Sequence, residues 1–264
     1  MKLDFNGLQA LVTGSTRGIG HAIASSLLES GASVAVHGRN PETVRRVAGE
    51  FSAAHFGCKI GATHGDLATP EGCDAVLAAC PAVDVLVHNA GMYEWSPFFE
   101  TDDDRWMRML QTNLLSGARL ARHYLAGMLE RGWGRIVFIA SDSGLNIPTD
   151  MIHYGVSKSA ELALMRGLAE LTAGTGVTVN AVLPGPTRTG AEGAFFDDYA
   201  REHGVPRADA ERHFLAERRP TSLLQRMASA EEVAAMVTYA CSRQASATNG
   251  AALRAEGGIL RHIG

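Results

Sequence analysis

The chain has 264 residues, of which 46% are hydrophobic and 20% are charged, and its formal net charge is −4. This length and apolar content suffice for a substantial core, so we expect residues 1–264 to form a single domain. The weak, scattered charge argues against nucleic acid or an anionic membrane as a partner, and the lack of a signal-peptide or membrane-spanning pattern favours a cytoplasmic location.

Short apolar runs alternate with segments of helical periodicity along most of the chain. Seven runs are expected to be strands: 8–14, 32–38, 59–66, 83–91, 134–141, 177–185 and 250–258. Six segments are expected to be helices: 19–31, 40–51, 69–80, 102–132, 151–176 and 229–242. Helices between apolar strands imply right-handed crossovers and a parallel sheet covered on both faces. The predicted fold is therefore an α/β, Rossmann-type doubly wound sheet of about seven strands.

The segment 188–222 interrupts this alternation. It is rich in charge, contains Phe195, Phe196 and Phe214, and has weak periodicity. A long insertion of this kind is often a substrate loop or lid, although a permanently packed helical excursion fits the sequence equally well.

A glycine-rich turn, "TGSTRGIG", joins the first expected strand to the first expected helix. Gly14 permits a tight turn, and Gly18 and Gly20 allow close approach of a ligand to the backbone. Because a helix N-terminus offers free N–H groups and a positive dipole end, the turn suits a pyrophosphate. The sequence lacks the G-K-[ST] ending of a phosphate-binding P-loop.

The end of the second expected strand indicates which dinucleotide binds. An NAD-binding fold usually has an acidic residue there, which holds the ribose 2′-hydroxyl. Here Gly38 occupies that position and Arg39 follows it, while Arg17 lies in the glycine-rich turn. Glycine leaves room for a 2′-phosphate and arginine attracts it, so NADP(H) is the expected cofactor, with NAD(H) as the alternative.

Tyr154 and Lys158 lie four residues apart, on one face of an expected helix, and Ser141 ends the strand before it. Carbonyl reduction needs a hydride on carbon and a proton on oxygen, and a phenol with a lowered pKa can exchange that proton. A cation about 4 Å away at an effective dielectric of about 20 would lower the pKa by roughly 3 units. We therefore expect Lys158 to lower the pKa of Tyr154, and the Ser141 hydroxyl to bind the substrate carbonyl.

These motifs together resemble those of the short-chain dehydrogenase/reductase family over nearly the whole chain. "TGSTRGIG" resembles its T-G-x-x-x-G-x-G, "HNAG" at 88–91 resembles its N-N-A-G with His88 replacing the first Asn, and "LPGPTRT" resembles its turn after the sixth strand. The family's catalytic residues match Asn113, Ser141, Tyr154 and Lys158. From the resemblance alone, Asn113 is expected to hold a water near Lys158.

The resemblance implies an NAD(P)-dependent oxidoreductase that commonly assembles as a homotetramer, or a homodimer. Its expected cofactor-binding residues are Thr13, Gly14, Ser15, Arg17, Gly18, Ile19, Gly20, Arg39, Asp66, Leu67, Asn89, Ala90, Gly91, Tyr154, Lys158, Pro184, Gly185, Thr187 and Thr189. None of the four cysteines forms a C-x-x-C pair, and no zinc-ligand spacing occurs, so we expect no metal.

Three functions remain open at this point. The leading one is NADP(H)-dependent hydride transfer to or from a ketone or secondary alcohol. The first alternative is a 3-oxoacyl thioester reductase of the acyl-carrier-protein type. Arg131 could supply the basic residue expected at the entrance of such an enzyme, but the acidic Glu170 stands where a second basic residue would help. The second alternative is a non-catalytic NADP-binding sensor or scaffold, against which the intact catalytic set argues.

Overall fold

A seven-stranded, entirely parallel sheet forms the centre of the computed structural model, which describes residues 3–190 and 192–263. The strand order is β3-β2-β1-β4-β5-β6-β9, so the order reverses between β1 and β4. The strands are β1 Gln9–Val12, β2 Ser33–Gly38, β3 Ile60–His64, β4 Val85–His88, β5 Trp133–Ile139, β6 Gly176–Pro184 and β9 Ala252–Ala255. The predicted doubly wound sheet is confirmed.

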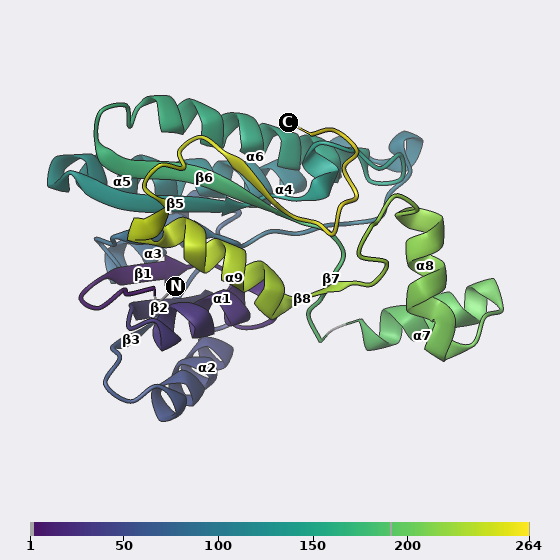
Figure 1. Cartoon of the computed structure of the whole chain (residues 1–264), viewed down its shortest axis with the longest axis horizontal. Helices are drawn as coiled ribbons and strands as arrows, with labels where there is room; N and C mark the ends of the chain where they lie inside the picture. The colour runs from purple at the N-terminus through teal and green to yellow at the C-terminus, as the bar shows by residue number, and fades with distance from the viewer. Residues whose placement is uncertain (1–2, 191, 264) are drawn as a thin grey trace.

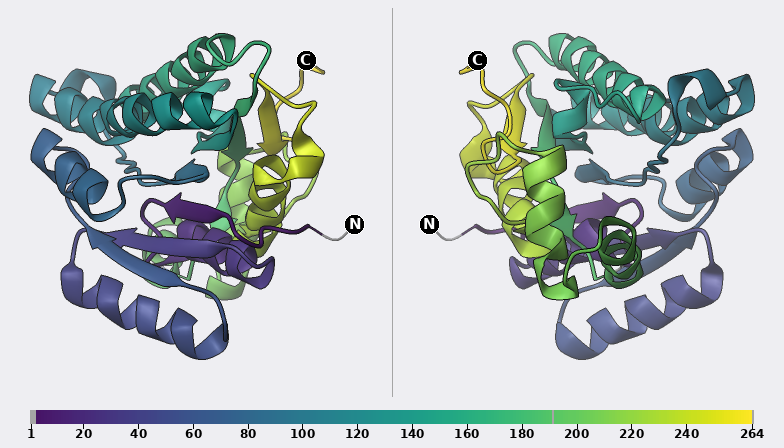
Figure 2. Two further views of the ribbon diagram at one scale, coloured as in Figure 1. Left: turned by 90° about the vertical axis from the view of Figure 1, so that its left-hand side faces the viewer. Right: turned by 90° about the vertical axis from the view of Figure 1, so that its right-hand side faces the viewer.

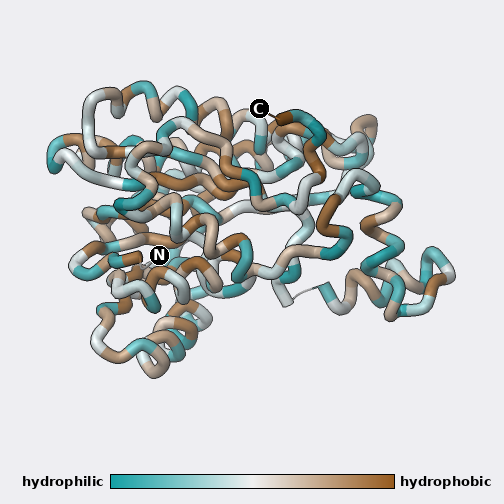
Figure 3. Tube along the Cα trace, in the orientation of Figure 1, coloured by the Kyte–Doolittle hydropathy of each residue, from teal (hydrophilic) through white to brown (hydrophobic). Residues whose placement is uncertain are grey.

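Helices cover both faces of the sheet (Figures 1 and 2). One core layer packs the sheet against α1, α2 and α9, and the other packs it against α3, α5 and α6. These helices are α1 Gly18–Glu29, α2 Pro41–Ala54, α3 Pro70–Ala79, α5 Ser116–Arg131, α6 Ile152–Glu170 and α9 Ala230–Cys241. Hydrophobic segments run along the central strands between the two layers (Figure 3), which is why the strands read as apolar runs.

The helix starts follow the capping signals in the sequence. The side chain of Asn40 accepts from the Thr43 N–H, and that of Thr69 accepts from the Gly72 N–H, each just before a proline at the first helical position. Ser229 and Glu232 complete a reciprocal capping box at the start of α9.

The single helix expected over 102–132 is divided in three. α4 spans Asp103–Leu110, a π-helical turn spans Gln111–Leu115, and α5 begins at Ser116. Hydrophobic periodicity did not reveal the extra residue of a π-turn, because the apolar positions continue on both sides of it. Such turns often occur at functional sites, and this one carries Asn113.

The segment 188–222 contains two helices, α7 Gly193–His203 and α8 Ala210–Arg218, which project from the carboxyl edge of the sheet (Figure 1). They have a small core of their own, made by Phe196, Tyr199, Ala200, Ala210, Phe214, Leu215 and Met227. A short parallel ribbon of β7 Thr187–Arg188 and β8 Ala228–Ser229 closes the base of this α7–α8 hairpin. The weak periodicity of the sequence therefore conceals helical structure. Over the described ranges, no helix has the length and apolarity needed to cross a bilayer.

Candidate active site

The four side chains predicted to be catalytic meet at the carboxyl edge of the sheet. Ser141 follows β5, Tyr154 and Lys158 lie on successive turns at the start of α6, and Asn113 comes from the π-turn. The Lys158 Nζ donates to the Ile139 carbonyl at 2.8 Å, which ties α6 to the end of β5. The fold thus brings together residues that lie up to 45 positions apart in the chain.

Asn113 is fully buried and all its polar atoms have partners. Its Nδ2 donates to the Met92 carbonyl and to the Ser157 Oγ, both at 2.9 Å, and its Oδ1 accepts from the Met92 N–H at 2.8 Å. Asn113 therefore joins the segment after β4 to α6. The predicted water between Asn113 and Lys158 stays a prediction.

The hydroxyl of Ser141 is held by its neighbours. It donates to the Asp142 Oδ1 at 3.0 Å and accepts from the Ser143 N–H at 3.1 Å. The other oxygen of Asp142 pairs with the Arg219 Nε at 3.2 Å. Burial raises the pKa of Asp142 above its ordinary value, and the nearby guanidinium of Arg219 offsets this only in part.

The predicted lowering of the Tyr154 pKa is wrong for the protein without a bound cofactor. Burial raises the pKa of Tyr154, and the favourable effects of Lys158 and of the Ser141 hydroxyl do not overcome it. One reason is that Lys158 is itself paired with the buried carboxylate of Glu161, at 2.8 Å. Burial disfavours the charge on Lys158, but Glu161 outweighs this effect and the pKa of Lys158 rises.

The glycine-rich turn forms an open cradle at the start of α1. Gly14 and Gly18 have φ values of +64° and +57°, which favour glycine. A Cβ at Gly20 would lie 2.4 Å from both the Gly14 carbonyl oxygen and the Asn89 Nδ2. No side chain caps α1 and its first turn has no acidic residue, so its N–H groups fit a pyrophosphate.

Hydrogen bonds fix this cradle to the end of β4. The Thr13 Oγ1 accepts from the N–H groups of Asn89 and Ala90, both at 2.9 Å, and the Asn89 side chain donates to the Thr13 carbonyl at 2.9 Å. Ser15 is buried, and its Oγ accepts from the His37 N–H at 3.0 Å. Ile19, in the first turn of α1, packs against the adjoining core layer.

The imidazole of His37 supports the same turn. Its Nδ1 accepts from the Gly14 N–H at 3.0 Å, which leaves Nε2 to donate to the Gly65 carbonyl at 3.2 Å. Burial lowers the pKa of His37 to about 4, in agreement with the neutral ring that this arrangement requires. Asp66, exposed, and Leu67, buried, follow Gly65 beyond the end of β3.

A side chain at Gly20 should close the cradle. Gly20→Ala is expected to weaken NADPH binding at least tenfold and to cost about 1–3 kcal/mol of stability, because backbone and Asn89 must move. Gly49→Ala is the control, since Gly49 lies in α2 with nothing within 4 Å of the added methyl. Calorimetric titration and thermal unfolding measure both. Equal NADPH affinity in the two variants would contradict the cradle.

Two exposed arginines lie where the adenosine half of the cofactor is predicted to bind. Arg17 precedes α1, and Arg39 follows Gly38, the last residue of β2. Gly38 is itself buried, and a Cβ there would lie 2.8 Å from the Thr16 Cγ2. The structure therefore places Gly38 against the glycine-rich turn, and the expectation that it leaves room for a 2′-phosphate stays a prediction.

The segment after β6 closes over the other end of the cradle. A Cβ at Gly18 would lie 3.0 Å from the Thr189 Cβ, so Thr189 packs directly on the glycine-rich turn. The Thr187 Oγ1 donates to the Gly185 carbonyl at 2.8 Å, one residue after β6 ends at Pro184. The Glu192 carboxylate accepts from the N–H and the hydroxyl of Thr189.

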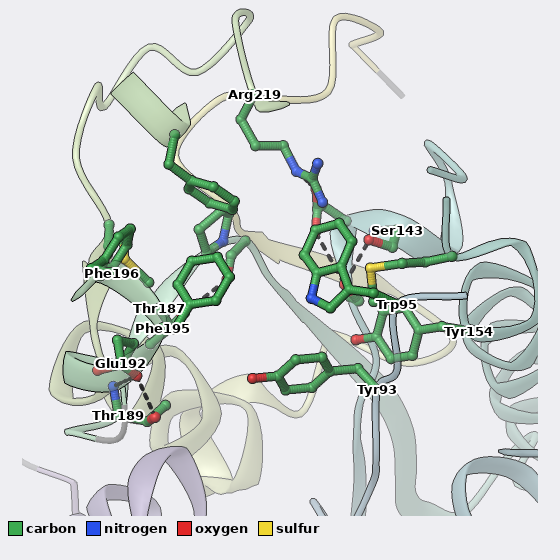
Figure 4. Close-up of a pocket in the computed structure, with 17 residues that line it drawn as sticks. Tyr93, Trp95, Ser143, Tyr154, Thr187, Thr189, Glu192, Phe195, Phe196 and Arg219 are labelled. Atoms are coloured by element: carbon green, nitrogen blue, oxygen red, sulfur yellow. Dashed lines mark hydrogen bonds and ion pairs between the residues drawn. The ribbon is translucent and has the colours of Figure 1, made fainter. Parts of the chain in front are cut away.

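A cavity of about 260 Å³ opens beside Ser141 and Tyr154. Figure 4 shows the rings of Tyr93, Trp95 and Tyr154 facing those of Phe195 and Phe196 across it. Polar groups of Asp142, Glu192 and Arg219 also line the cavity. The α7–α8 hairpin and the segment after β4 therefore form opposite walls around the predicted catalytic residues.

The hairpin is expected to become better protected when ligands bind. In amide hydrogen exchange, residues 193–218 should exchange more slowly with NADPH and a reducible ketone than in the free chain, because one cavity wall is then held from both sides. α5 serves as the internal reference. Equal protection of the hairpin in both states would favour a permanently packed excursion.

Sequence reasoning missed several residues of the site: His37, Asp142, Glu161, Glu192 and Arg219. Asp142 adjoins Ser141, and Glu161 lies three residues after Lys158, so spacing alone could have drawn attention to both. Arg219 reaches Asp142 from 77 residues away, which only the fold reveals. Arg131, considered for the entrance, instead donates to the Val83 carbonyl at the opposite edge of the sheet, and that expectation is wrong.

A parallel sheet with a glycine-rich turn at its switch point and a Tyr–Lys pair beside it defines a dinucleotide-dependent oxidoreductase. The chain belongs to the short-chain dehydrogenase/reductase family, because the family model described as short chain dehydrogenase matches residues 9–200. It is an NAD(P)-dependent enzyme of that family, as predicted.

Relatives and solved structures match over nearly the whole chain. An uncharacterised oxidoreductase of Bacillus subtilis is 44% identical over 100% of both chains. A 3-oxoacyl-[acyl-carrier-protein] reductase of Aquifex aeolicus is 30% identical over 98% of this chain and 100% of its own. The crystal structure of L-sorbose reductase from Gluconobacter frateurii, complexed with NADPH and L-sorbose, covers 100% of both chains at 28% identity and a TM-score of 0.92.

Proposed function

We propose that the protein is an NADP(H)-dependent reductase of a small hydroxylated ketone. The observation that carries this proposal is the cavity in which Ser141 and Tyr154 lie between aromatic rings and carboxylates. Because burial raises the pKa of Tyr154, the phenol holds its proton near neutral pH. A protonated phenol suits reduction, which must deliver a proton to the carbonyl oxygen.

The residues divide the work of this reaction. A nicotinamide held at the glycine-rich cradle would supply a hydride for the carbonyl carbon. Tyr154 gives its proton to the carbonyl oxygen, so that the product is the neutral alcohol. Ser141, whose single hydroxyl proton is donated to the Asp142 Oδ1 in the free chain, would turn that proton to the same carbonyl oxygen as charge develops on it. Lys158 holds a positive charge beside the phenol and has an N–H left for the ribose of the cofactor.

NADP(H) is the proposed cofactor because the end of β2 has Gly38 and Arg39 in place of an acidic residue, and Arg17 lies in the glycine-rich turn. Binding of NADPH by the similar L-sorbose reductase supports the same choice. The glycine-rich cradle, Asn89 and Thr189 would hold the pyrophosphate and the nicotinamide half.

A hydroxylated ketone suits the chemistry of the cavity walls. Aromatic rings such as Trp95 and Phe195 stack against the C–H faces of a sugar or polyol, while Asp142 and Glu192 accept from its hydroxyls. The full-length similarity to L-sorbose reductase supports this substrate class. The similarity to the 3-oxoacyl-[acyl-carrier-protein] reductase of Aquifex aeolicus supports a 3-oxoacyl thioester as the alternative substrate of this protein.

A substrate panel tests the proposal. NADPH oxidation is followed with ketoses, short hydroxyketones, an aromatic ketone and a 3-oxoacyl thioester, each at the same concentration. The highest kcat/KM is expected for a hydroxylated ketone. A preference for the thioester would instead identify the protein as a 3-oxoacyl thioester reductase. No oxidation of NADPH with any compound would support a non-catalytic NADP-binding protein.

We also propose that the chain assembles as a homotetramer. Met107 on α4 and Leu171 just after α6 are 51% and 63% exposed, so apolar side chains face outward beside the two helices that carry the site. Light scattering at micromolar concentration should give four times the mass of one chain. A monomer would contradict the assembly without affecting the proposed reaction.

A further inference from the structure

A chain of buried polar side chains lies directly beneath Lys158. The Lys158 Nζ donates to the Glu161 Oε2 at 2.8 Å, and the other oxygen of Glu161 contacts the His88 Nδ1 at 3.0 Å. The His88 Nε2 contacts the Ser116 Oγ at 2.7 Å. These residues come from α6, the end of β4 and the start of α5, so the chain joins three elements beneath the site.

This row of hydrogen-bonded side chains is shielded from water. Glu161, His88 and Ser116 are fully buried, and Lys158 is 5% exposed. A buried carboxylate is costly unless it is paired and hydrogen-bonded, and here Lys158 and His88 satisfy one oxygen each. Gly117 leaves room for the imidazole, because a Cβ there would lie 3.1 Å from His88 ring atoms.

The hydrogen-bond pattern excludes a proton path to solvent through this chain. The Ser116 hydroxyl donates to the Thr112 carbonyl at 2.5 Å, and a peptide carbonyl neither stores nor releases a proton at ordinary pH. The row of Glu161, His88 and Ser116 therefore acts on Lys158 by holding it in position and by its charge. Two of the three N–H groups of the Lys158 ammonium are occupied, by Ile139 and Glu161, so its remaining N–H has one defined direction.

We propose that Glu161, anchored by His88, is a positioning residue that orients the Lys158 ammonium and sets, by its charge, the pH range in which Tyr154 exchanges its proton. The proposal rests on the proposed role of Tyr154. The negative charge of Glu161 opposes the effect of Lys158 on the phenol and favours its protonated form. The charged or titratable groups that face this unit are Lys158 and Tyr154 on α6, Asp142 after β5, His88 on β4 and His37 on β2.

Two substitutions of Glu161 separate the effect of its negative charge from the effect of its side-chain length. Glu161→Gln keeps the length and one of the two acceptor oxygens but removes the charge, so with Lys158 protonated the midpoint of Tyr154 ionisation should fall by at least about 0.5 pH unit. Glu161→Asp keeps the charge but is one methylene shorter, so Lys158 should lose its fixed direction. For Glu161→Asp, the Kd for NADPH should rise at least about threefold, with a midpoint close to that of wild type.

The midpoint is measured from phenolate absorbance in the full-length protein with NADPH bound, by subtracting the titration of Tyr154→Phe from that of each other variant. Calorimetry gives the Kd for NADPH, and circular dichroism checks folding. His88→Asn removes the anchor and should raise the Kd as Glu161→Asp does. A purely structural role for Glu161 would change stability without a directed shift of the Tyr154 midpoint.

A folded Glu161→Gln protein with the wild-type midpoint, or a folded Glu161→Asp protein with the wild-type Kd, would overturn the proposal. If Glu161→Gln does not fold, the Kd of Glu161→Asp decides. If neither variant folds, the unit is only structural and the proposal fails. Neither readout needs a substrate, so a failure of every ketone in the panel would overturn the proposed function and leave this result standing.

Discussion

Replacing Tyr154 by Phe is expected to reduce kcat at least about 10²-fold, while NADPH still binds with nearly wild-type affinity. The substitution removes the hydroxyl that would give its proton to the carbonyl oxygen and keeps the ring, which lies in edge contact with Tyr93 at 6.4 Å between centroids. Folding should therefore be preserved. Steady-state rates with NADPH and the best ketone of the panel measure the loss.

Tyr93→Phe is the matched control for this prediction. It removes a hydroxyl from a ring that lines the same cavity, but one that lies on the segment after β4 and has no lysine one turn away. We expect Tyr93→Phe to change kcat less than tenfold. If Tyr154→Phe retains wild-type turnover, or if both variants lose activity equally, Tyr154 is not the proton donor.

The second large effect concerns the choice of cofactor. Wild type is expected to favour NADPH over NADH by roughly 10- to 10⁴-fold in kcat/KM, because a 2′-phosphate can form one or two charge-assisted hydrogen bonds with Arg39 and Arg17. Values near the lower end are expected, since both arginines are exposed. Gly38→Asp combined with Arg39→Ala should reverse the order, because the new carboxylate accepts from the 2′-hydroxyl of NADH and repels the 2′-phosphate.

Controls separate charge from crowding in the double variant. Gly38→Ala adds only a Cβ, which would lie 2.8 Å from the Thr16 Cγ2 and force that methyl to move. This variant should weaken the binding of NADPH and of NADH alike. Arg45→Ala removes an exposed arginine from α2 without touching the predicted site and should leave the preference unchanged. A wild type that prefers NADH, or a double variant that still prefers NADPH, would show that the adenosine ribose lies elsewhere.

The sheet and the meeting of the predicted catalytic residues could be anticipated from the sequence because both depend on local patterns. Apolar strands of β-branched residues, proline-started helices such as the one capped by Asn40, and the spacing of Ser141, Tyr154 and Lys158 each lie within a short window. The parallel order of the strands then follows from right-handed crossovers.

The contacts that set the electrostatics could not be predicted in this way. Glu161 meets His88 from 73 residues away, and Arg219 meets Asp142 from 77 residues away. The pairing of Lys158 with Glu161, by contrast, is local, and leaving it out gives Lys158 its full effect on the phenol and the wrong direction for the Tyr154 pKa shift. A packed helical excursion at 188–222 stayed one of two alternatives, because the charged outer positions of α7 and α8 obscure the helical period in the sequence.

Isotope transfer can follow the hydride from the cofactor to the carbonyl carbon and show whether Tyr154 is the proton donor. Wild type and Tyr154→Phe are each incubated with the best ketone and with NADPH carrying deuterium at one or the other face of the nicotinamide C4. With wild type, one of the two labelled cofactors is expected to place deuterium on the carbinol carbon of the product. Tyr154→Phe should form at least about 10² times less labelled alcohol in the same time. An alcohol product without deuterium from either cofactor, or equal labelling by the two proteins, would contradict this mechanism.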